Sequence, residues 1–556
     1  MEPRLTVAAP DPVALPKINL SLLEIAAGAI ALTIALPLVV VVLNLLVPRA
    51  DTWAHLASTV LPDYLWNTLV LAFCVGAGVT VVGVSCAWLT SMCRFPGRRI
   101  FEWTLILPMA MPAYVMAYVY TDFFQFAGPL QSALRSWTGW RAGDYAMPDI
   151  RSLGGAAFVL VAVLYPYVYL LARTAFLEQS GSSFETARAL GQGPWRTFFR
   201  VALPLARPAI AAGVALAMME TLADYGTVAY FGVDTFSTGV FRAWFSLGDP
   251  VAAAQIGALL LAGVGSILAL ERALRGRSAF HSGPRRAPAP HVLRGVRAAV
   301  AVGVCAIPAA AGFFLPLGLL LRLALQDTEP GFAQRFAGLA FNSLSLAGIT
   351  SVLAVAGALA IAYAARLHPG PAASIANRTA ALGYAIPGVV VAVGVLVPVT
   401  LLDCWLSEWL AAHFGVAPQL WLSGTIAALV YAYLVRFMSI SLQAVEAGLA
   451  KIRRSMDDAA RSLGMPPSQA LLRVHAPLLA KSLLAAGLLV FVDVMKELPA
   501  TLAMRPFNFD TLAVQTYNLA KDERLAEASV AALAILAVGM IPVLMLTRTM
   551  ARRQEA

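Results

Sequence analysis

The sequence FETARALGQGPWRTFFRVALP, residues 184–204, returns in related form as DDAARSLGMPPSQALLRVHAP, residues 457–477. The two copies align without a gap at an offset of 273 residues. Each copy is a polar segment between long apolar runs. Self-similarity at one long offset indicates that the chain consists of two copies of a single structural unit. Whatever the protein does, it needs this segment twice.

The composition indicates a membrane protein. Of the 556 residues, 60% are hydrophobic and 13% are charged, whereas about a quarter of the residues in ordinary soluble domains are charged. Many apolar runs reach the roughly 20 residues that cross a bilayer as a helix. Because these runs do not alternate between polar and apolar residues, they predict helices rather than a barrel. We attribute the net charge of +10 to cytoplasmic loops and expect no binding to nucleic acid.

The apolar runs divide into two sets of six. They predict an all-α integral membrane protein with about 12 transmembrane helices, arranged as two parallel six-helix repeats. The predicted units are a cytoplasmic tail (1–20), repeat 1 (21–275) with its polar segment (182–204), a basic linker rich in Pro and Gly (276–296), and repeat 2 (297–556) with its polar segment (455–477). The sequences WNTLVLA, from Trp66, and FNSLSLA, from Phe341, open the second span of each half.

The distribution of Lys and Arg predicts the orientation in the membrane. Cytoplasmic loops carry an excess of these residues, which places the N- and C-termini in the cytoplasm. Because each half contains an even number of spans, both polar segments then lie on the cytoplasmic side.

Each polar segment is predicted to form a short helix, a turn and a second helix that runs into a span. A serine followed three positions later by an acidic residue, at Ser182 and again at Ser455, has the spacing of a capping box. Gly191 and Gly464 stand where a helix would end. The proline three positions after each glycine suits the first turn of the next helix. The intact spacing favours a docking surface over a loop kept only by duplication.

The polar segments resemble the EAA loop of ABC importer permeases, E-x-A-x-x-x-G followed after nine residues by I/V-x-L-P. The matching residues are Glu185, Ala187, Gly191, Val201, Leu203 and Pro204 in the first copy, and Asp458, Ala460, Gly464, Val474, Ala476 and Pro477 in the second. The second copy departs from the pattern with Asp for Glu and Ala for Leu. The resemblance implies a fold like that of type I ABC importers, in which each loop forms a coupling helix seated in a cytoplasmic ATPase.

The energy source is expected to lie in another subunit. The chain contains no G-x-x-x-x-G-K-[ST] phosphate loop, so we expect it to be a transport subunit rather than an enzyme. ATP is then bound and hydrolysed by a partner ABC ATPase subunit, expected as a homodimer with one copy under each repeat.

Two pairs of carboxylates lie deeper in the membrane. Glu220 and Asp224 end the fifth span, and Asp493 and Glu497 end the eleventh, again at an offset of 273 residues. A spacing of four residues predicts that each pair shares one helix face, and carboxylates at membrane depth usually face a path or cavity. We predict that the two pairs face each other and transiently hold a hard, highly charged cation. The alternative is structural, with Lys496 neutralising one of its neighbours.

The residues around the pairs predict where the helices break. Gly226 and Pro499 follow the two pairs and indicate the broken helix ends that binding regions of transporters often contain. Tyr225 and Lys496 adjoin the pairs and are further candidates for lining the path.

The same segments narrow the resemblance. LADYGTVAYFGVDTFSTGVFRAWF (222–245) and KELPATLAMRPFNFDTLAVQTYNLAKDERLAEAS (496–529) resemble fused permeases of the iron(III) importer group, and the likeness covers nearly the whole chain. It implies a bacterial inner-membrane protein that takes Fe³⁺ as cargo from a periplasmic iron-binding protein and has no tightly bound cofactor.

Other cargoes and another class remain open. Permeases for thiamine and other small solutes share the loops and the fused layout, so thiamine or a polyamine is an alternative cargo. An oxyanion is disfavoured because the carboxylates would repel it. An ion-coupled secondary transporter would use the same carboxylates but leaves the two cytoplasmic loops unexplained.

Overall fold

The computed structural model describes residues 22–141, 143–179, 181–275, 291–326, 332–368 and 370–555. The predicted tail and most of the predicted linker lie outside these ranges. Within them, 11 helices are long and apolar enough to cross a membrane, and the bent pair Arg98–Ala110 and Ala113–Thr138 raises the number to 12. The predicted all-α membrane architecture is confirmed. The third predicted span is not straight, because the chain turns by 97° at Pro112.

The helices of repeat 1 are α1 (Leu22–Leu43), α2 (Ala50–Thr59), α3 (Leu61–Met92), α4 (Arg98–Thr104), α5 (Ala113–Phe124), α6 (Pro129–Thr138), α7 (Leu153–Glu178), α8 (Gly181–Ala189), α9 (Pro194–Thr197), α10 (Leu203–Ala223), α11 (Gly226–Tyr230), α12 (Phe236–Phe241) and α13 (Pro250–Arg275).

The helices of repeat 2 are α14 (Val296–Ala309), α15 (Leu315–Ala324), α16 (Phe332–Leu367), α17 (Pro371–Ala381), α18 (Gly388–Phe414), α19 (Ile426–Leu449), α20 (Ser455–Ser462), α21 (Pro467–Ala470), α22 (Ala476–Met495), α23 (Pro499–Met504), α24 (Leu512–Lys521) and α25 (Leu525–Glu555). Two short strands, β1 (Cys93–Arg94) and β2 (His291–Val292), pair in parallel. Single π-helical turns at Phe198–Ala202 and Leu471–His475 join α9 to α10 and α21 to α22.

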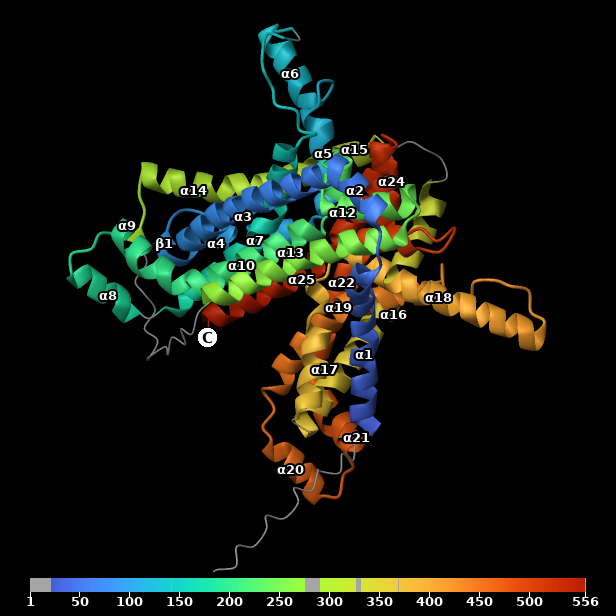
Figure 1. Cartoon of the computed structure of the whole chain (residues 1–556). Helices are drawn as coiled ribbons and strands as arrows, with labels where there is room; N and C mark the ends of the chain where they lie inside the picture. Colours follow the sequence, from blue (N-terminus) through green and yellow to red (C-terminus); the bar gives the residue numbers. More distant parts are fainter. Residues whose placement is uncertain are drawn as a thin grey trace, which may run out of the picture.

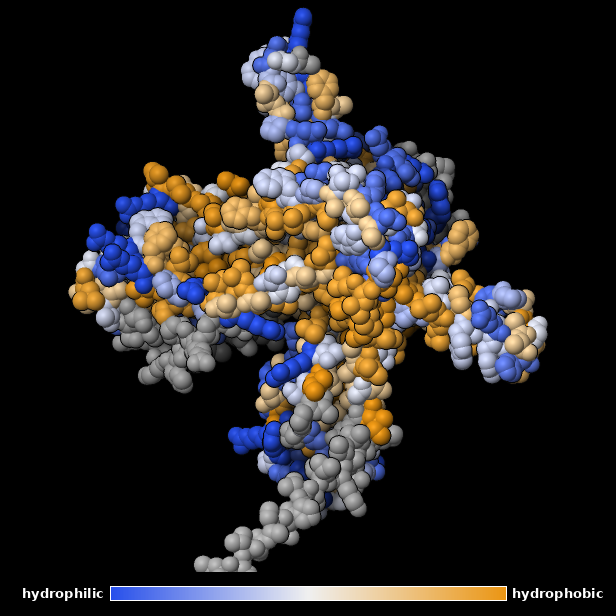
Figure 2. Space-filling model, viewed as in Figure 1, coloured by the Kyte–Doolittle hydropathy of each residue, from blue (hydrophilic) through white to orange (hydrophobic). Residues whose placement is uncertain are grey.

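Each repeat is built around three packed helices, α3, α7 and α10 in repeat 1 and α16, α19 and α22 in repeat 2. Close packing of membrane helices relies on small residues at the contact. Gly83 of α3 and Gly213 of α10 provide this on the two sides of Val168 in α7, because a Cβ at either glycine would lie within 2.8 Å of Val168 atoms. The two bundles diverge from a common centre, one toward α8 and the other toward α20 (Figure 1). Their flanks are largely apolar, and polar residues gather near the ends (Figure 2).

The same tertiary hydrogen bonds recur in both repeats. The Asn67 side chain donates to the Asp234 carbonyl at 2.9 Å, and the Asn342 side chain donates to the Asp510 carbonyl at 3.0 Å. Asn67 belongs to WNTLVLA and Asn342 to FNSLSLA. The two sequences therefore occupy equivalent places at the start of α3 and within α16.

The first helix of each repeat packs against the other repeat. α1 lies against α16, α17 and α18, whereas α14 lies against α3 and α4. β2, at the end of the connection between the repeats, pairs with β1 at the end of α3, with Cys93 opposite His291. Gly312, between α14 and α15 of repeat 2, also packs closely on α7 of repeat 1, since a Cβ there would lie 2.5 Å from the Ala162 carbonyl oxygen. The two repeats are therefore interlocked rather than merely adjacent.

Candidate functional site: a central cavity and two coupling loops

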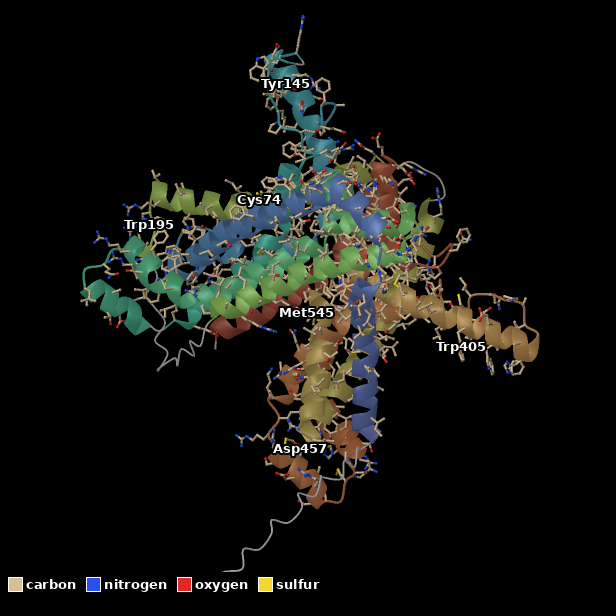
Figure 3. The ribbon with its side chains drawn as sticks, viewed as in Figure 1. Cys74, Tyr145, Trp195, Trp405, Asp457 and Met545 are labelled. Atoms are coloured by element: carbon tan, nitrogen blue, oxygen red, sulfur yellow. The ribbon has the colours of Figure 1, made fainter. Side chains whose placement is uncertain are left out.

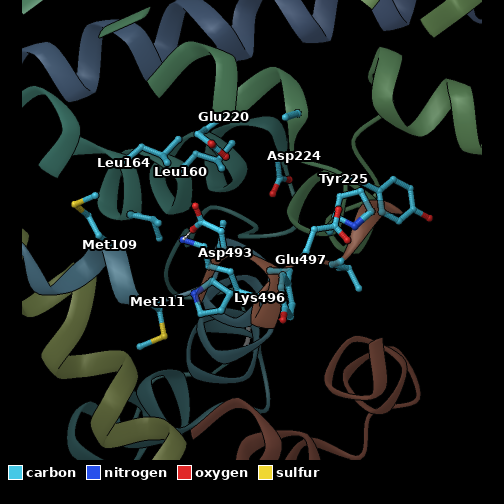
Figure 4. A pocket seen from close by; sticks show the side chains of 18 of the residues that line it. Met109, Met111, Leu160, Leu164, Glu220, Asp224, Tyr225, Asp493, Lys496 and Glu497 are labelled. Carbon is cyan, nitrogen blue, oxygen red and sulfur yellow. Dashed lines mark ion pairs between the residues drawn. The ribbon is translucent and has the colours of Figure 1, made fainter. Parts of the chain in front are cut away.

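A cavity of about 130 Å³ lies where the ends of α10 and α22 meet. Its lining includes every residue predicted for the path, namely Glu220, Asp224, Tyr225, Asp493, Lys496 and Glu497. The structure thus brings together carboxylates that are 273 residues apart in the chain (Figure 4). The walls also include Tyr114, Tyr167, Tyr384 and Arg436, which the sequence had not singled out.

The helices break within each carboxylate pair. α10 ends at Ala223, and α22 ends at Met495. The first carboxylate of each pair therefore lies on the last helical turn, and the second lies beyond the helix end. The breaks expected from Gly226 and Pro499 are confirmed, but the prediction that each pair shares one helix face is wrong.

The second carboxylate of each pair supplies acceptors for the first turn of the next short helix. Asp224 accepts bonds from the backbone N–H groups of Thr227 at 3.0 Å and Val228 at 3.2 Å. Glu497 accepts bonds from the N–H groups of Ala500 and Thr501, both at 2.9 Å. The N–H groups at a helix start have no partner within the helix, and a carboxylate that satisfies them stabilises the helix. This demand explains why the long helix stops before these residues.

Two cations from repeat 2 bind the carboxylates of repeat 2. Arg436 Nη1 lies 3.0 Å from Glu497 Oε1. Lys496 Nζ lies 2.8 Å from Asp493 Oδ1 (Figure 4). A Cβ at Gly388 would lie only 2.4 Å from Arg436 Nη1, so a larger residue there would displace the Arg436–Glu497 pair. The pairing of Lys496 matches the structural alternative considered above. Arg436 was missed, although an ionisable residue inside a span is itself a signal of a polar path.

The carboxylates do not form a ready-made metal site. Among the residues that the structure describes, no group of three or more His, Cys, Asp or Glu side chains is close enough to hold a metal ion. The physical reason is that Asp224 and Glu497 are committed to the starts of α11 and α23. The cavity therefore differs from a set of four convergent carboxylate ligands.

The two polar segments form the predicted helix, turn and helix. α8 is followed by Gly191 with φ of +72°, and α20 by Gly464 with φ of +74°. In both, the residue after the glycine donates its N–H five residues back, to the carbonyl of Ala187 or Ala460, at 3.0 Å. This closure of a helix end requires the left-handed backbone that glycine adopts freely.

The residues that resemble the EAA pattern take matching positions in the two copies. Ala187 and Ala460 are buried, whereas Glu185 and Asp458 are exposed. Pro204 and Pro477 lie in the first turns of α10 and α22. α9, the π turn and α10 form one span, Trp195–Ala223, and the matching span is Pro467–Met495. Each loop is thus continuous with a helix that ends at the cavity.

The predicted capping box is wrong in the second copy. The residue that precedes α20 is Arg454, and no side chain caps the helix. The N–H groups of Met456 and Asp457 already bond to the carbonyls of Arg453 and Arg454, which leaves no role for the Ser455 hydroxyl as a cap. The side chains of residues 181–183 in the first copy lie outside the described part of the structure.

Both loops present apolar side chains at equivalent positions. Leu190 and Phe199 in the first loop correspond to Leu463 and Leu472 in the second, and all four are between 58% and 75% exposed. Trp195 adds to the first loop (Figure 3). Leu190 and Leu463 lie outside the candidate membrane spans, and exposed apolar side chains in such a place commonly mark a surface that binds another protein.

The loops are anchored to their repeats by different chemistry. Phe184 of the first loop packs against Trp88, which also contacts Phe198 with ring centroids 4.8 Å apart. Asp457 takes the equivalent place in the second loop, 2.8 Å from Arg366 Nη2 and 2.7 Å from Nε2 of the buried His475 (Figure 3). An aromatic anchor in repeat 1 is therefore replaced by an ionic one in repeat 2.

The chain consists of two interlocked six-span repeats, and in each a helix–turn–helix loop is joined to a central polar cavity. This arrangement defines a multi-pass membrane transport subunit. The chain belongs to the family described as the binding-protein-dependent transport system inner membrane component, whose model matches residues 79–275 and again 356–555. It is therefore an inner-membrane permease subunit of an ABC importer.

Several relatives carry names that state a cargo. The Fe(3+)-transport system permease protein FbpB 2 of Haemophilus influenzae is 23% identical over 87% of this chain and 90% of its own length. The molybdenum transport system permease protein ModB of Escherichia coli is 28% identical over 31% of this chain and 74% of its own length. The sulfate transport system permease protein CysT of Escherichia coli is 29% identical over 36% of this chain and 70% of its own length.

Proposed function

We propose that this permease carries ferric iron from a periplasmic iron-binding protein into the cytoplasm. The observation that carries the proposal is that four carboxylates, Glu220, Asp224, Asp493 and Glu497, line one cavity. The two cations in its wall, Arg436 and Lys496, are held by carboxylates, which leaves an excess of negative charge. Such a field favours a cation over an anion. Similarity to FbpB 2 along most of both chains supports the same cargo.

The transport step is alternating access driven by a partner ATPase, proposed as a homodimer with no nucleotide bound by the permease itself. The exposed apolar residues of the two loops would seat in the ATPase subunits. Because each loop is continuous with α10 or α22, a displacement at the loop moves the helix end at the cavity. Glu185, Ala187, Gly191 and Pro204, with Asp458, Ala460, Gly464 and Pro477, are the proposed coupling residues.

The orientation follows from these roles. Both loops are proposed to face the cytoplasmic ATPase, and with an even number of spans in each repeat the N- and C-termini would then be on the same, cytoplasmic side. Glu220, Asp224, Asp493 and Glu497 then form the translocation path together with Tyr225 and Lys496. Asp224 and Glu497 shape the path by starting α11 and α23, and the other residues face the passing ion.

An oxyanion is the second candidate cargo, because Arg436 and Lys496 also line the cavity and two relatives are named for sulfate and molybdenum.

The deciding experiment reconstitutes the permease with its ATPase in liposomes and adds cargo-loaded binding protein. We expect ATP hydrolysis and uptake to be stimulated by the Fe³⁺-loaded protein. Stimulation by a sulfate-, thiamine- or polyamine-loaded protein, with none from iron, would replace iron as the cargo. Uptake driven by an ion gradient without ATPase would overturn the importer mechanism.

A further inference from the structure

The charges around the cavity are divided unequally between the repeats. Asp493 and Glu497 are each bound to a cation, and Asp224 accepts bonds from α11. Within the described part of the chain, the Glu220 carboxylate makes no ion pair and no hydrogen bond. It is therefore the cavity carboxylate that remains free to bind something else.

Two tyrosines share the cavity wall with Glu220. Tyr167 of α7 and Tyr384, two residues before the Ile386–Pro387 bend, line the same cavity and interact with each other through their side chains. Both also lie within electrostatic range of Glu220 and Asp493. Two carboxylates and two phenols, contributed by both repeats, thus line one cavity.

The Tyr114 hydroxyl is a second indication that a ligand belongs here. The Tyr114 side chain is 6% exposed and lines the cavity, and its hydroxyl has no hydrogen-bond partner among the described residues. Buried hydroxyl groups almost always have a partner. An unsatisfied one in a cavity wall indicates that the space is used by a polar ligand or by water.

Lys496 lines the same cavity as this group. Its ammonium binds Asp493 at 2.8 Å and lies within electrostatic range of Tyr167 and Glu220. The equivalent residue in repeat 1, at the offset of 273, is Ala223, so only one such cation is present. Lysine is a compact point charge on a flexible stem, which allows it to leave without disturbing the backbone.

We propose that a trivalent cation is coordinated transiently by oxygen atoms of Glu220, Asp493, Tyr167 and Tyr384, and that Lys496 is a resident cation which holds this place between transport cycles. The proposal rests on the proposed function only for the identity of the cargo. Carboxylate and phenol oxygens are hard donors that suit a small, highly charged ion. The ion must displace the ammonium from Asp493, which keeps binding weak enough for release, as transport requires.

Terbium(III) is a suitable probe, since it is a hard trivalent ion whose luminescence is sensitised by nearby tyrosine. The probe is added to the purified permease–ATPase complex, and sensitised emission is titrated. We expect weak saturable binding to the wild type. Lys496→Met should raise the affinity about tenfold, and Glu220→Gln should lower it about tenfold, the size of one charge-assisted contact. The tighter binding of Lys496→Met cannot result from misfolding.

Further variants test whether terbium binds in the cavity. The double variant Tyr167→Phe and Tyr384→Phe should bind terbium more weakly and lose part of the sensitised emission, because Tyr114 and Tyr225 remain in the cavity wall. Tyr120→Phe, whose hydroxyl bonds the Ala311 carbonyl, and Glu527→Gln, which pairs with Arg524, lie outside the cavity and should bind terbium as the wild type does. Emission that is unaffected by the cavity variants would mean terbium bound only at surface carboxylates and would overturn the proposal.

Iron uptake by the same variants separates this inference from the proposed function. Iron uptake that is insensitive to Glu220→Gln and to the double tyrosine variant would disprove the coordination site while leaving the iron importer intact. A terbium site that responds as expected, in a complex that takes up no iron, would keep the site and reject the cargo.

Discussion

At the scale of single residues, Gly191 and Gly464 are the positions where the backbone conformation most clearly requires glycine. A Cβ at either position would meet nothing within 4 Å, so a substitution is opposed only by the positive φ. For an L-residue with a side chain, that backbone conformation costs about 1–2 kcal/mol.

We therefore expect Gly191→Ala or Gly464→Ala to loosen the end of α8 or α20 and to reduce cargo-stimulated ATP hydrolysis severalfold. Gly193→Ala is the matched control, because Gly193 is in the same loop, is equally open and does not have a positive φ. Co-purification with the ATPase and the stimulated rate measure the effect. Equal behaviour of the Gly191 and Gly193 variants would contradict the role of the left-handed turn.

The Arg436–Glu497 pair allows a second residue-scale prediction. Replacing one partner of a buried ion pair leaves the other uncompensated, at a cost of about 3–5 kcal/mol. Arg436→Met and Glu497→Gln should each lower the thermal unfolding midpoint of the detergent-solubilised protein. The double variant should recover part of the loss, and strict additivity of the two effects would show that the pair is not coupled.

The sequence predicts these two kinds of residue unequally well. The glycines are visible because helix ends have a local signature of Gly, an open turn and Pro. The partner of Arg436 is not visible, because Glu497 is 61 residues away and only the packing of α19 against the start of α23 brings the two together. The repeat offset predicts the four path carboxylates, and Tyr225 and Lys496 follow as their neighbours in the chain, but the offset does not state what each residue binds.

At the scale of elements, the two coupling loops differ in how they are held. Asp457 and His475 stand in repeat 2 where repeat 1 has Phe184 and Ala202, and Arg366 completes the ionic anchor while also donating to the Leu449 and Ile452 carbonyls. Removal of the Asp457 charge therefore affects α16, α19 and α20 together.

Asp457→Asn should destabilise the second loop by a few kcal/mol, because Arg366, whose side chain is only 11% exposed, loses its counter-ion. Asp458→Asn is a control one residue away, since the Asp458–Arg461 pair is exposed and is worth less than about 1 kcal/mol. Hydrogen exchange of residues 450–475 is the measurement. Similar exchange in both variants would contradict the ionic anchor.

The boundaries of the helices are the part of the fold that the sequence predicts wrongly. The carboxylate pairs were assigned to continuous helices because a spacing of four residues fits one helical face. The start of a second helix competes for the same carboxylates, and its unsatisfied N–H groups end the first helix early. The capping box at Ser455 failed for a similar reason, since a backbone turn had already used the donors that the serine would satisfy.

At the scale of the whole molecule, the exchange of first helices makes each repeat depend on the other. α1 contributes Ala27 and Ile34 to a buried apolar cluster whose other members, such as Ala358 and Leu442, belong to repeat 2. The sequence predicts two six-span units but gives no sign of the exchange, because apolar spans fit any apolar neighbour.

Deletion of residues 1–47 should therefore destabilise repeat 2 more than repeat 1, although the deleted helix belongs to repeat 1. Limited proteolysis with mass spectrometry would detect the early cleavage sites in α16, α17 or α19. As a control, the full-length chain cleaved between residues 276 and 290 should keep its two parts associated. Cleavage confined to repeat 1 after the deletion would contradict the exchanged packing.

The pairing of β1 with β2 shows how closely the connection between the repeats is tied to repeat 1. A permease assembled from two copies of repeat 2 would place every residue of that repeat twice around its axis. Arg436, Lys496, Asp493 and Glu497 would then each appear twice in the cavity. Four cations would then face four carboxylates, and the excess of negative charge would vanish. By joining two unequal halves, the fused chain breaks that symmetry, and one half can contribute both cations while the other keeps an unpaired carboxylate.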